Sequence, residues 1–230
     1  HAHEAFNAWY HALYIGQVAR RGRAQYDFPV LYTNVMIGET GYEEPGKCYN
    51  SGAAVGRVLD IWKKGAPALD LIAPDIYNPE LSVYSRICSR YARPDNALFI
   101  PETSPTGEAF AMDLIRAAAD YGAIGLCGFG AESALTNNGE LSEDAYPVMV
   151  SMRTIQNLAP LLIRYRGTGR IHCFLQEEFA IKQYLKLPKY HVVANYLRGS
   201  SLRHGLGSRI NLRDPENEKH LNARGRGILI

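Results

Sequence analysis

The sequence lacks the close cysteine pairs that would assign it to a metal-binding or redox class. Its four cysteines, Cys48, Cys88, Cys127 and Cys173, are widely separated and form no C-x-x-C motif. Structural zinc sites and thioredoxin-like motifs rely on such pairs, so their absence argues against both. Scattered cysteines fit two disulfides or four free thiols, and we expect free, buried thiols.

The sequence also has no long apolar run, no N-x-[ST] acceptor site for N-glycosylation and no strong excess of charge of one sign. No stretch of 18 apolar residues occurs, so we expect no membrane-spanning helix. The formal net charge is only +2, and the best basic cluster, within 198–213, is followed directly by acidic residues. We therefore expect a solvated loop there and no nucleic-acid partner.

The sequence also gives no sign of a resident cofactor or metal. Gly128-Phe129-Gly130 lacks the third glycine of a dinucleotide-binding fingerprint. His1-Ala2-His3 fits a pair on a helix surface better than a chelating site. We expect no cofactor and no metal.

What the first 165 residues do show is a regular alternation of strand-like and helix-like segments. Phe6, Trp9, Tyr10 and Leu13 follow the spacing of one helix face, so the chain opens in a helix. Apolar stretches at 28–35, 69–77, 97–102 and 123–129 predict four strands. Helical patterns between and after them include Tyr84, Ile87, Cys88 and Tyr91 before Pro94, and a last helix at about 147–162.

Apolar strands that alternate with amphipathic helices are typical of a parallel sheet covered by helices. Four such units make an open doubly wound sheet or half of a (β/α)8 barrel, which needs eight. We favour the half barrel, because both ends of the chain fall where an element is unfinished. The fold class is therefore α/β.

After about residue 166 the helical period disappears. Segments at 190–197, 208–212 and 227–230 look like β-strands joined by Gly, Pro and charged turns. We therefore divide the chain into residues 1–168, the second half of the barrel, and residues 169–230, the start of an all-β domain.

Polar and aromatic residues follow the apolar strands, where a barrel carries its catalytic groups. Glu102 stands out, because the run Phe99-Ile100-Pro101 delivers a carboxylate to the rim. Such a group can attack an anomeric carbon or take a proton, whereas its structural alternatives are a helix cap or an ion pair with an arginine. The other rim candidates are Asn34, Tyr77, Phe129 and Glu132, with Asp75 beside Tyr77.

These candidates also have structural interpretations. Asn34 fits a sugar contact or a turn, and Tyr77 fits a bond to a nucleophile or sugar or an aromatic packed under a loop. Phe129 fits a stacking platform or plain core, and Glu132 fits a sugar contact or a helix cap.

The motifs LDLIAPDIY (69–77) and LFIPE (98–102) resemble those of family 35-like β-galactosidases, retaining glycosidases with (β/α)8 barrels. The resemblance is strong over 52–102, fair over AIGLCGFGAES and weaker in the tail. Within this family, the sequence is most similar to the branch in which a β-domain follows the barrel. The predicted strands would then be the fifth to eighth of the barrel.

The resemblance implies that Glu102 is the catalytic nucleophile at the end of the seventh strand. It also implies an acid/base glutamate in an Asn-Glu pair at the end of strand four. No such pair precedes the first predicted strand, and the chain's Asn217-Glu218 lies in the tail. We therefore expect an incomplete fragment that lacks its proton donor and shows little activity alone.

The first functional hypothesis is thus a retaining glycoside hydrolase that acts on terminal β-galactosides or related sugars by double displacement. The alternative is a non-catalytic carbohydrate-binding or scaffold protein that keeps part of the barrel. An open-sheet enzyme of another kind is disfavoured, because no phosphate-binding glycine loop is found. The sequence leaves the exact sugar, the localisation and the oligomeric state open.

Overall fold

The computed structural model describes residues 2–27, 30–37, 44–177, 180–196 and 224–230. Within them, strands and helices alternate up to residue 165, and short strands follow. The helices are α1 (Ala2–Gln25), α2 (Leu59–Gly65), α3 (Leu81–Tyr91), α4 (Glu108–Ala119) and α5 (Tyr146–Tyr165). The strands are β1 (Tyr32–Met36), β2 (Leu71–Asp75), β3 (Phe99–Thr103), β4 (Gly125–Gly128), β5 (His172–Leu175), β6 (Lys182–Lys186), β7 (His191–Asn195) and β8 (Arg226–Leu229).

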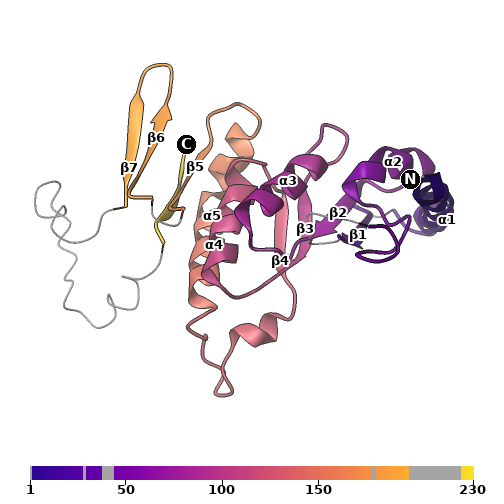
Figure 1. Ribbon diagram of the computed structural model, residues 1–230, viewed down its shortest axis with the longest axis horizontal. Helices are drawn as coiled ribbons and strands as arrows, with labels where there is room; N and C mark the ends of the chain where they lie inside the picture. The colour runs from indigo at the N-terminus through magenta and orange to yellow at the C-terminus, as the bar shows by residue number, and fades with distance from the viewer. Residues whose placement is uncertain (1, 28–29, 38–43, 178–179, 197–223) are drawn as a thin grey trace, which may run out of the picture.

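The molecule is elongated, and its elements follow one another along the long axis. Helices α1 and α2 lie at one end with β1 and β2, whereas β3 and β4 lie in the middle with α3, α4 and α5 (Figure 1). Strands β5, β6 and β7 lie at the other end. No helix in the described part of the chain is long and apolar enough to cross a membrane.

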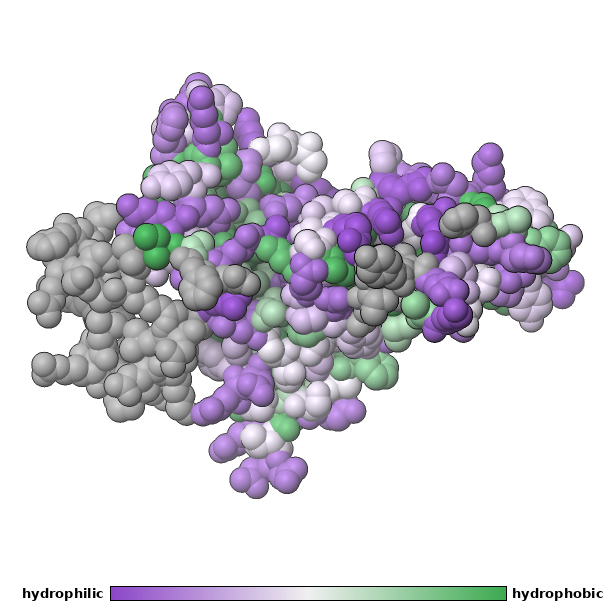
Figure 2. Space-filling model, in the orientation of Figure 1, coloured by the Kyte–Doolittle hydropathy of each residue, from purple (hydrophilic) through white to green (hydrophobic). Residues whose placement is uncertain are grey.

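Helix α1 forms where the aromatic spacing predicts it, but it buries a different face. Its buried positions include Ala8, Ala12, Gly16 and Ala19, which let α2 approach closely. A side chain in place of the Gly16 hydrogen would meet the Gly65 carbonyl oxygen at 2.6 Å. The aromatic residues are exposed instead (Phe6 61%, Trp9 41%, Tyr10 55%), and hydrophobic side chains reach the surface at this end of the molecule (Figure 2).

Strands β1 and β2 pair in parallel, with Tyr32 opposite Leu71 and Met36 opposite Asp75. All five residues of β2 are buried, as expected for a strand with neighbours on both sides and helices over its face. Strands β3 and β4 form a second parallel pair, whose register shifts between Ile100 and Thr103.

The Asn96 side chain and one backbone hydrogen bond join the two pairs. Asn96 Oδ1 accepts from the Ile72 amide at 2.8 Å, and Asn96 Nδ2 donates to the Ile72 carbonyl at 3.0 Å. Near the other end, the Ile76 amide donates to the Glu102 carbonyl at 2.9 Å. Both strands therefore run in the same direction, and the spatial order β1-β2-β3-β4 follows the sequence. The described strands do not close into a barrel.

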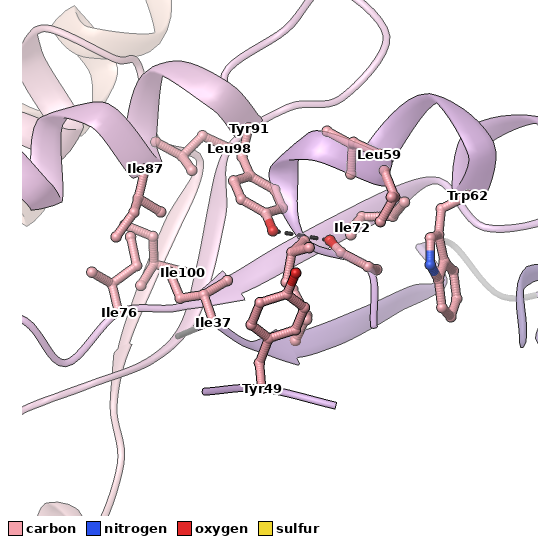
Figure 3. Packing of buried hydrophobic residues seen from close by; sticks show 14 of the residues in the cluster. Ile37, Tyr49, Leu59, Trp62, Ile72, Ile76, Ile87, Tyr91, Leu98 and Ile100 are labelled. Atoms are coloured by element: carbon pink, nitrogen blue, oxygen red, sulfur yellow. Dashed lines mark hydrogen bonds between the residues drawn. The ribbon is translucent and has the colours of Figure 1, made fainter. Parts of the chain in front are cut away.

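The largest apolar cluster packs α2 and α3 against these strands. Leu59 and Trp62 come from α2, Tyr91 from α3, and Ile72 and Ile100 from β2 and β3 (Figure 3). The buried Tyr91 hydroxyl donates to the Ala54 carbonyl at 2.9 Å, so this polar group costs little to bury.

Antiparallel strands follow the helical part, as the loss of helical period predicts. Strand β5 pairs with β8, and β6 pairs with β7. Cys173 and Leu175 of β5 share an apolar cluster with Met112 and Ile115 of α4, so residues on both sides of position 168 pack together. The strand predicted at 208–212 and the first residues of the one at 28–35 lie outside the described residues.

The cysteine prediction holds in one respect and is wrong in another. All four are free thiols, but Cys48 and Cys127 are exposed, and only Cys88 and Cys173 are buried. Cys127 lies on β4, none of whose four residues is fully buried, so the faces of this strand are not completely covered.

Candidate active site

Three neighbouring strands bring Asn34, Asp75 and Glu102 together. Asp75 is the last residue of β2, and Glu102 is the last but one of β3. Asn34 is the third residue of β1, which continues one residue further than the apolar pattern predicts. Because the three strands run in one direction, these residues meet at the same edge of the sheet.

The carboxylate of Glu102 is held by two neutral donors. Its Oε1 accepts from Asn34 Nδ2 at 3.2 Å, and its Oε2 accepts from the Tyr77 hydroxyl at 2.9 Å. No arginine or lysine of the described chain forms an ion pair with it, and helix α4 takes Gly107 as its N-cap. Both structural alternatives for Glu102 are therefore absent from the described residues.

Asn34 connects two carboxyl groups through one amide nitrogen. Besides Glu102 Oε1, Asn34 Nδ2 donates to Asp75 Oδ2 at 3.0 Å. An amide nitrogen carries two hydrogens, so both are used inside the site. These two bonds fix the orientation of the exposed Asn34 side chain. Its side-chain oxygen, Oδ1, is the polar atom that is left to bind a ligand.

Asp75 is the candidate residue that sequence reasoning ranked too low. It is 2% exposed, and its Oδ1 is buried without a hydrogen-bond partner among the described residues. Burial, and then the nearby charge of Glu102, raise the pKa of Asp75 to about 6, against a smaller opposing effect of the Asn34 hydrogen bond. The sequence signal was present in Asp75-Ile76-Tyr77, where two polar residues two positions apart follow an apolar strand.

The remaining two candidates follow β4, and among the described residues no hydrogen bond joins either side chain to Glu102. Phe129 directly follows β4, its amide donates to the Thr103 carbonyl at 2.9 Å, and its side chain is 62% exposed. It is therefore not a core residue. Glu132 lies in the short 3-10 helix Ala131–Ala134, where its side chain is exposed and caps nothing.

A cavity of about 610 Å³ opens beside Asn34. Its lining includes the aromatic residues His11, Tyr14, Tyr49 and Trp62. Tyr49 is fixed there by two residues far apart in the sequence: its hydroxyl donates to the buried Glu4 carboxylate, which also accepts from Arg57 Nε at 3.0 Å. Burial, followed by the bond to Glu4, raises the pKa of Tyr49 to about 12.

The site therefore offers a carboxylate at the edge of a sheet, held by an amide and a phenol. Among the described residues, no group of three His, Cys, Asp or Glu side chains could hold a metal ion. A carboxylate held in this way is suited to nucleophilic attack or to proton transfer.

No protein-family model matches the chain, and no curated protein is significantly similar to it.

Proposed function

We propose that this chain carries the nucleophile-bearing part of a retaining β-glycosidase that acts on terminal β-galactosides or related sugars. One observation supports this most: Glu102 lies at the end of a parallel strand with one oxygen bonded to Asn34 and the other to Tyr77. Neutral donors orient a carboxylate without cancelling its charge, as a nucleophile requires.

In the proposed reaction, a Glu102 oxygen attacks the anomeric carbon while the bond to the leaving oxygen breaks. The bonding electrons depart with the leaving group, which takes a proton, and a glycosyl ester of Glu102 remains. Water then attacks the same carbon and gives one proton to the group that protonated the leaving oxygen, and the bond to Glu102 breaks, which restores the carboxylate. Tyr77 and Asn34 hold Glu102, and the Asn34 carbonyl oxygen accepts a hydrogen bond from a sugar hydroxyl.

We propose that β1 to β4 are the fifth to eighth strands of a (β/α)8 barrel. Consecutive strands lie next to one another in sequence order, as in a barrel, whereas a doubly wound sheet reverses its order at a switch point. The residues after about 168 would then begin a β-rich accessory domain. Phe129 and Glu132, which lie beyond β4, remain proposed sugar contacts.

The proposed chemistry needs a second carboxyl group as proton donor, about 5–5.5 Å from the nucleophile. Among the described residues, Asp75 is the other carboxyl group in the site, but it is 2% exposed and faces Asn34. We therefore propose that the donor is not among these residues, and that the chain alone turns over glycosides with poor leaving groups very slowly.

The second candidate, a carbohydrate-binding or scaffold protein without catalysis, is favoured by the same observation: Asp75, the carboxyl group bonded to Asn34 beside Glu102, is buried. The two candidates differ in the charge that they prefer in a ligand. A glycosidase site stabilises the positive charge that develops on the sugar ring, whereas a simple binding site has no such requirement.

Calorimetric titration with two ligands separates them. A cationic, galactose-configured iminosugar should bind at least about tenfold more tightly than galactose, and Glu102→Gln should remove the difference. A matched control, Glu140→Gln, changes an exposed carboxylate in the loop before α5 and should leave the preference intact. Equal affinity for the two ligands in the unaltered chain would support the non-catalytic candidate.

A further inference from the structure

The two carboxyl groups of the site are linked, because Asn34 Nδ2 donates to both. Asp75 Oδ2 lies 3.0 Å from this nitrogen and Glu102 Oε1 lies 3.2 Å from it. Two negative charges so close together repel each other, and one amide offsets only part of the repulsion. The charge on one group therefore affects the proton on the other.

Asp75 is the member of the pair suited to carry a proton. Its Oδ1 is buried with no donor among the described residues, so the ionised form leaves a buried charged oxygen unsatisfied. Glu102, in contrast, has a donor on each oxygen and is only half-buried.

The charges that face Asp75 come from few elements. Strand β3 contributes Glu102, and β1 contributes the neutral Asn34. After β2 comes the phenol of Tyr77, which is bonded to Glu102. Helix α3 packs against β2 and carries the buried Tyr84 and Cys88, both uncharged near neutral pH because burial raises their pKa values. Glu102 is thus the charged group that acts on Asp75.

We propose that Asp75 is a positioning residue that binds its proton more tightly while Glu102 is charged and releases it more readily when Glu102 becomes neutral. The catalytic meaning of this proposal rests on the proposed function. When a Glu102 oxygen bonds to the anomeric carbon, the carboxylate becomes an ester and its negative charge disappears. Asp75 then loses its proton to solvent water, and its ionised carboxylate takes a stronger hydrogen bond from Asn34.

The same coupling acts in reverse, because linkage between two sites is reciprocal. If removing the charge of Glu102 favours ionised Asp75, ionised Asp75 favours loss of the charge on Glu102. Formation of the glycosyl ester should therefore become faster as the pH rises through about 6, the pKa of Asp75. The proton on Asp75 is not transferred to the leaving group.

The direct test measures the pKa of Asp75 from the carboxyl carbon chemical shift of ¹³C-aspartate-labelled protein. Glu102→Gln should lower the pKa of Asp75, because a raising charge is removed. Asn34→Ala should raise it, because a hydrogen bond to the ionised form is lost. Glu140→Gln, an exposed control, should leave it unchanged.

Two opposite shifts from two neighbours distinguish coupling from a general loosening of the site, which would move the pKa in one direction in both variants. An unchanged or raised pKa of Asp75 in Glu102→Gln overturns the inference and leaves the proposed function intact. No labelling of Glu102 by an activated glycoside, despite the shifts, overturns the proposed function and with it the catalytic role of Asp75.

A kinetic test uses Asp75→Asn, which keeps the size of the side chain and an oxygen acceptor for Asn34. The rate at which an activated fluorosugar labels Glu102 should rise through about pH 6 in the unaltered chain, and this rise should be absent in Asp75→Asn. Asp75→Leu, which removes the acceptor, should slow labelling by about 10²-fold at every pH. If Asp75→Asn instead slows only substrates with poor leaving groups, Asp75 is a proton donor and the positioning role is contradicted.

Discussion

At the scale of single residues, three carboxyl groups of the described chain are buried, and each has a different hydrogen-bonding environment. Glu4 is satisfied by Tyr49 and Arg57, and Asp75 is partly satisfied by Asn34. Asp113 on α4 is 2% exposed, and its Oδ2 has no hydrogen-bond partner among the described residues. Burial raises the pKa of Asp113 to about 8, although Arg116 opposes the shift.

Asp113 should therefore make stability depend on pH. Its pKa in the fold is higher than the ordinary value of 3.8, so its contribution is complete below pH 4 and is lost as the pH rises through 8. Asp113→Asn should keep the protein more stable at pH 8 than the unaltered chain, by more than about 1 kcal/mol, with the difference shrinking toward pH 4.

Urea unfolding at a series of pH values measures this difference. Asp144→Asn, at an exposed position, is the control and should follow the unaltered chain at every pH. A gap between Asp113→Asn and the unaltered chain that stays constant with pH would contradict the explanation.

The sequence predicted the rim residues because a carboxylate directly after an apolar strand is visible without any structure. Glu102 was found in this way and Asn34 and Tyr77 as polar residues near strand ends, and the structure brings the three side chains into hydrogen-bonding contact. The sequence could not predict that Asp75 and Glu102 accept hydrogen bonds from the same Asn34 amide, since that depends on strand register. Nor did a lone Glu4 on the first helix show that it would meet Tyr49 and Arg57.

At the scale of elements, a side chain forms hydrogen bonds that backbone groups of a neighbouring strand usually form. The buried Asn96 takes the place of a strand residue between β2 and β3, because it bonds both the amide and the carbonyl of Ile72. It also donates to the Tyr91 carbonyl at 3.0 Å, which ties the end of α3 to the sheet. The alignment of Asp75 with Glu102 therefore depends on Asn96.

Asn96→Leu should destabilise the protein by about 3 kcal/mol, since it removes the two side-chain hydrogen bonds that the buried amide and carbonyl of Ile72 make with Asn96. The comparison is Asn157→Leu, at an exposed position of α5, which should change stability by less than about 0.5 kcal/mol. Chemical unfolding measures both. Similar small effects from the two variants would show that Asn96 does not hold β2 and β3 together.

Periodicity predicted the helices and strands to within a few residues, because each repeats the spacing of its own structure. It could not choose the buried face of α1, where two apolar patterns compete. The small residues win, because Gly16 and Ala12 allow contact with Gly65 of α2, which larger residues would prevent.

Gly16→Val should therefore push α1 away from α2 and lower the free energy of unfolding by about 1–3 kcal/mol. Gln17→Val adds the same side chain at the next, exposed position and should cost less than about 0.5 kcal/mol. Thermal unfolding of the two variants, measured under the same conditions, compares these losses of stability. Equal losses would mean that the α1–α2 contact tolerates a larger residue.

At the scale of the whole molecule, the described strands keep sequence order, and the antiparallel strands β5 and β8 pack on α4. The sequence predicted both the alternation and the change to β-structure near residue 166. The sequence could not predict how these strands pack against the helices. That packing depends on contacts between residues far apart in the sequence, such as the hydrogen bond from Arg226 Nε to Ser151 Oγ at 2.7 Å, which joins residues 75 positions apart.

The central claim is that Glu102 forms a covalent bond with a sugar, and covalent trapping tests it most directly. A 2-deoxy-2-fluoro-β-galactoside with a dinitrophenyl leaving group needs no proton donor, so it should label this chain even if, as we propose, the acid/base residue is not among the described residues. Mass spectrometry should place the label on Glu102. Glu102→Gln should abolish it, while Glu132→Gln should still be labelled. A label on Glu132 or any other residue, or no label at all, would contradict the account.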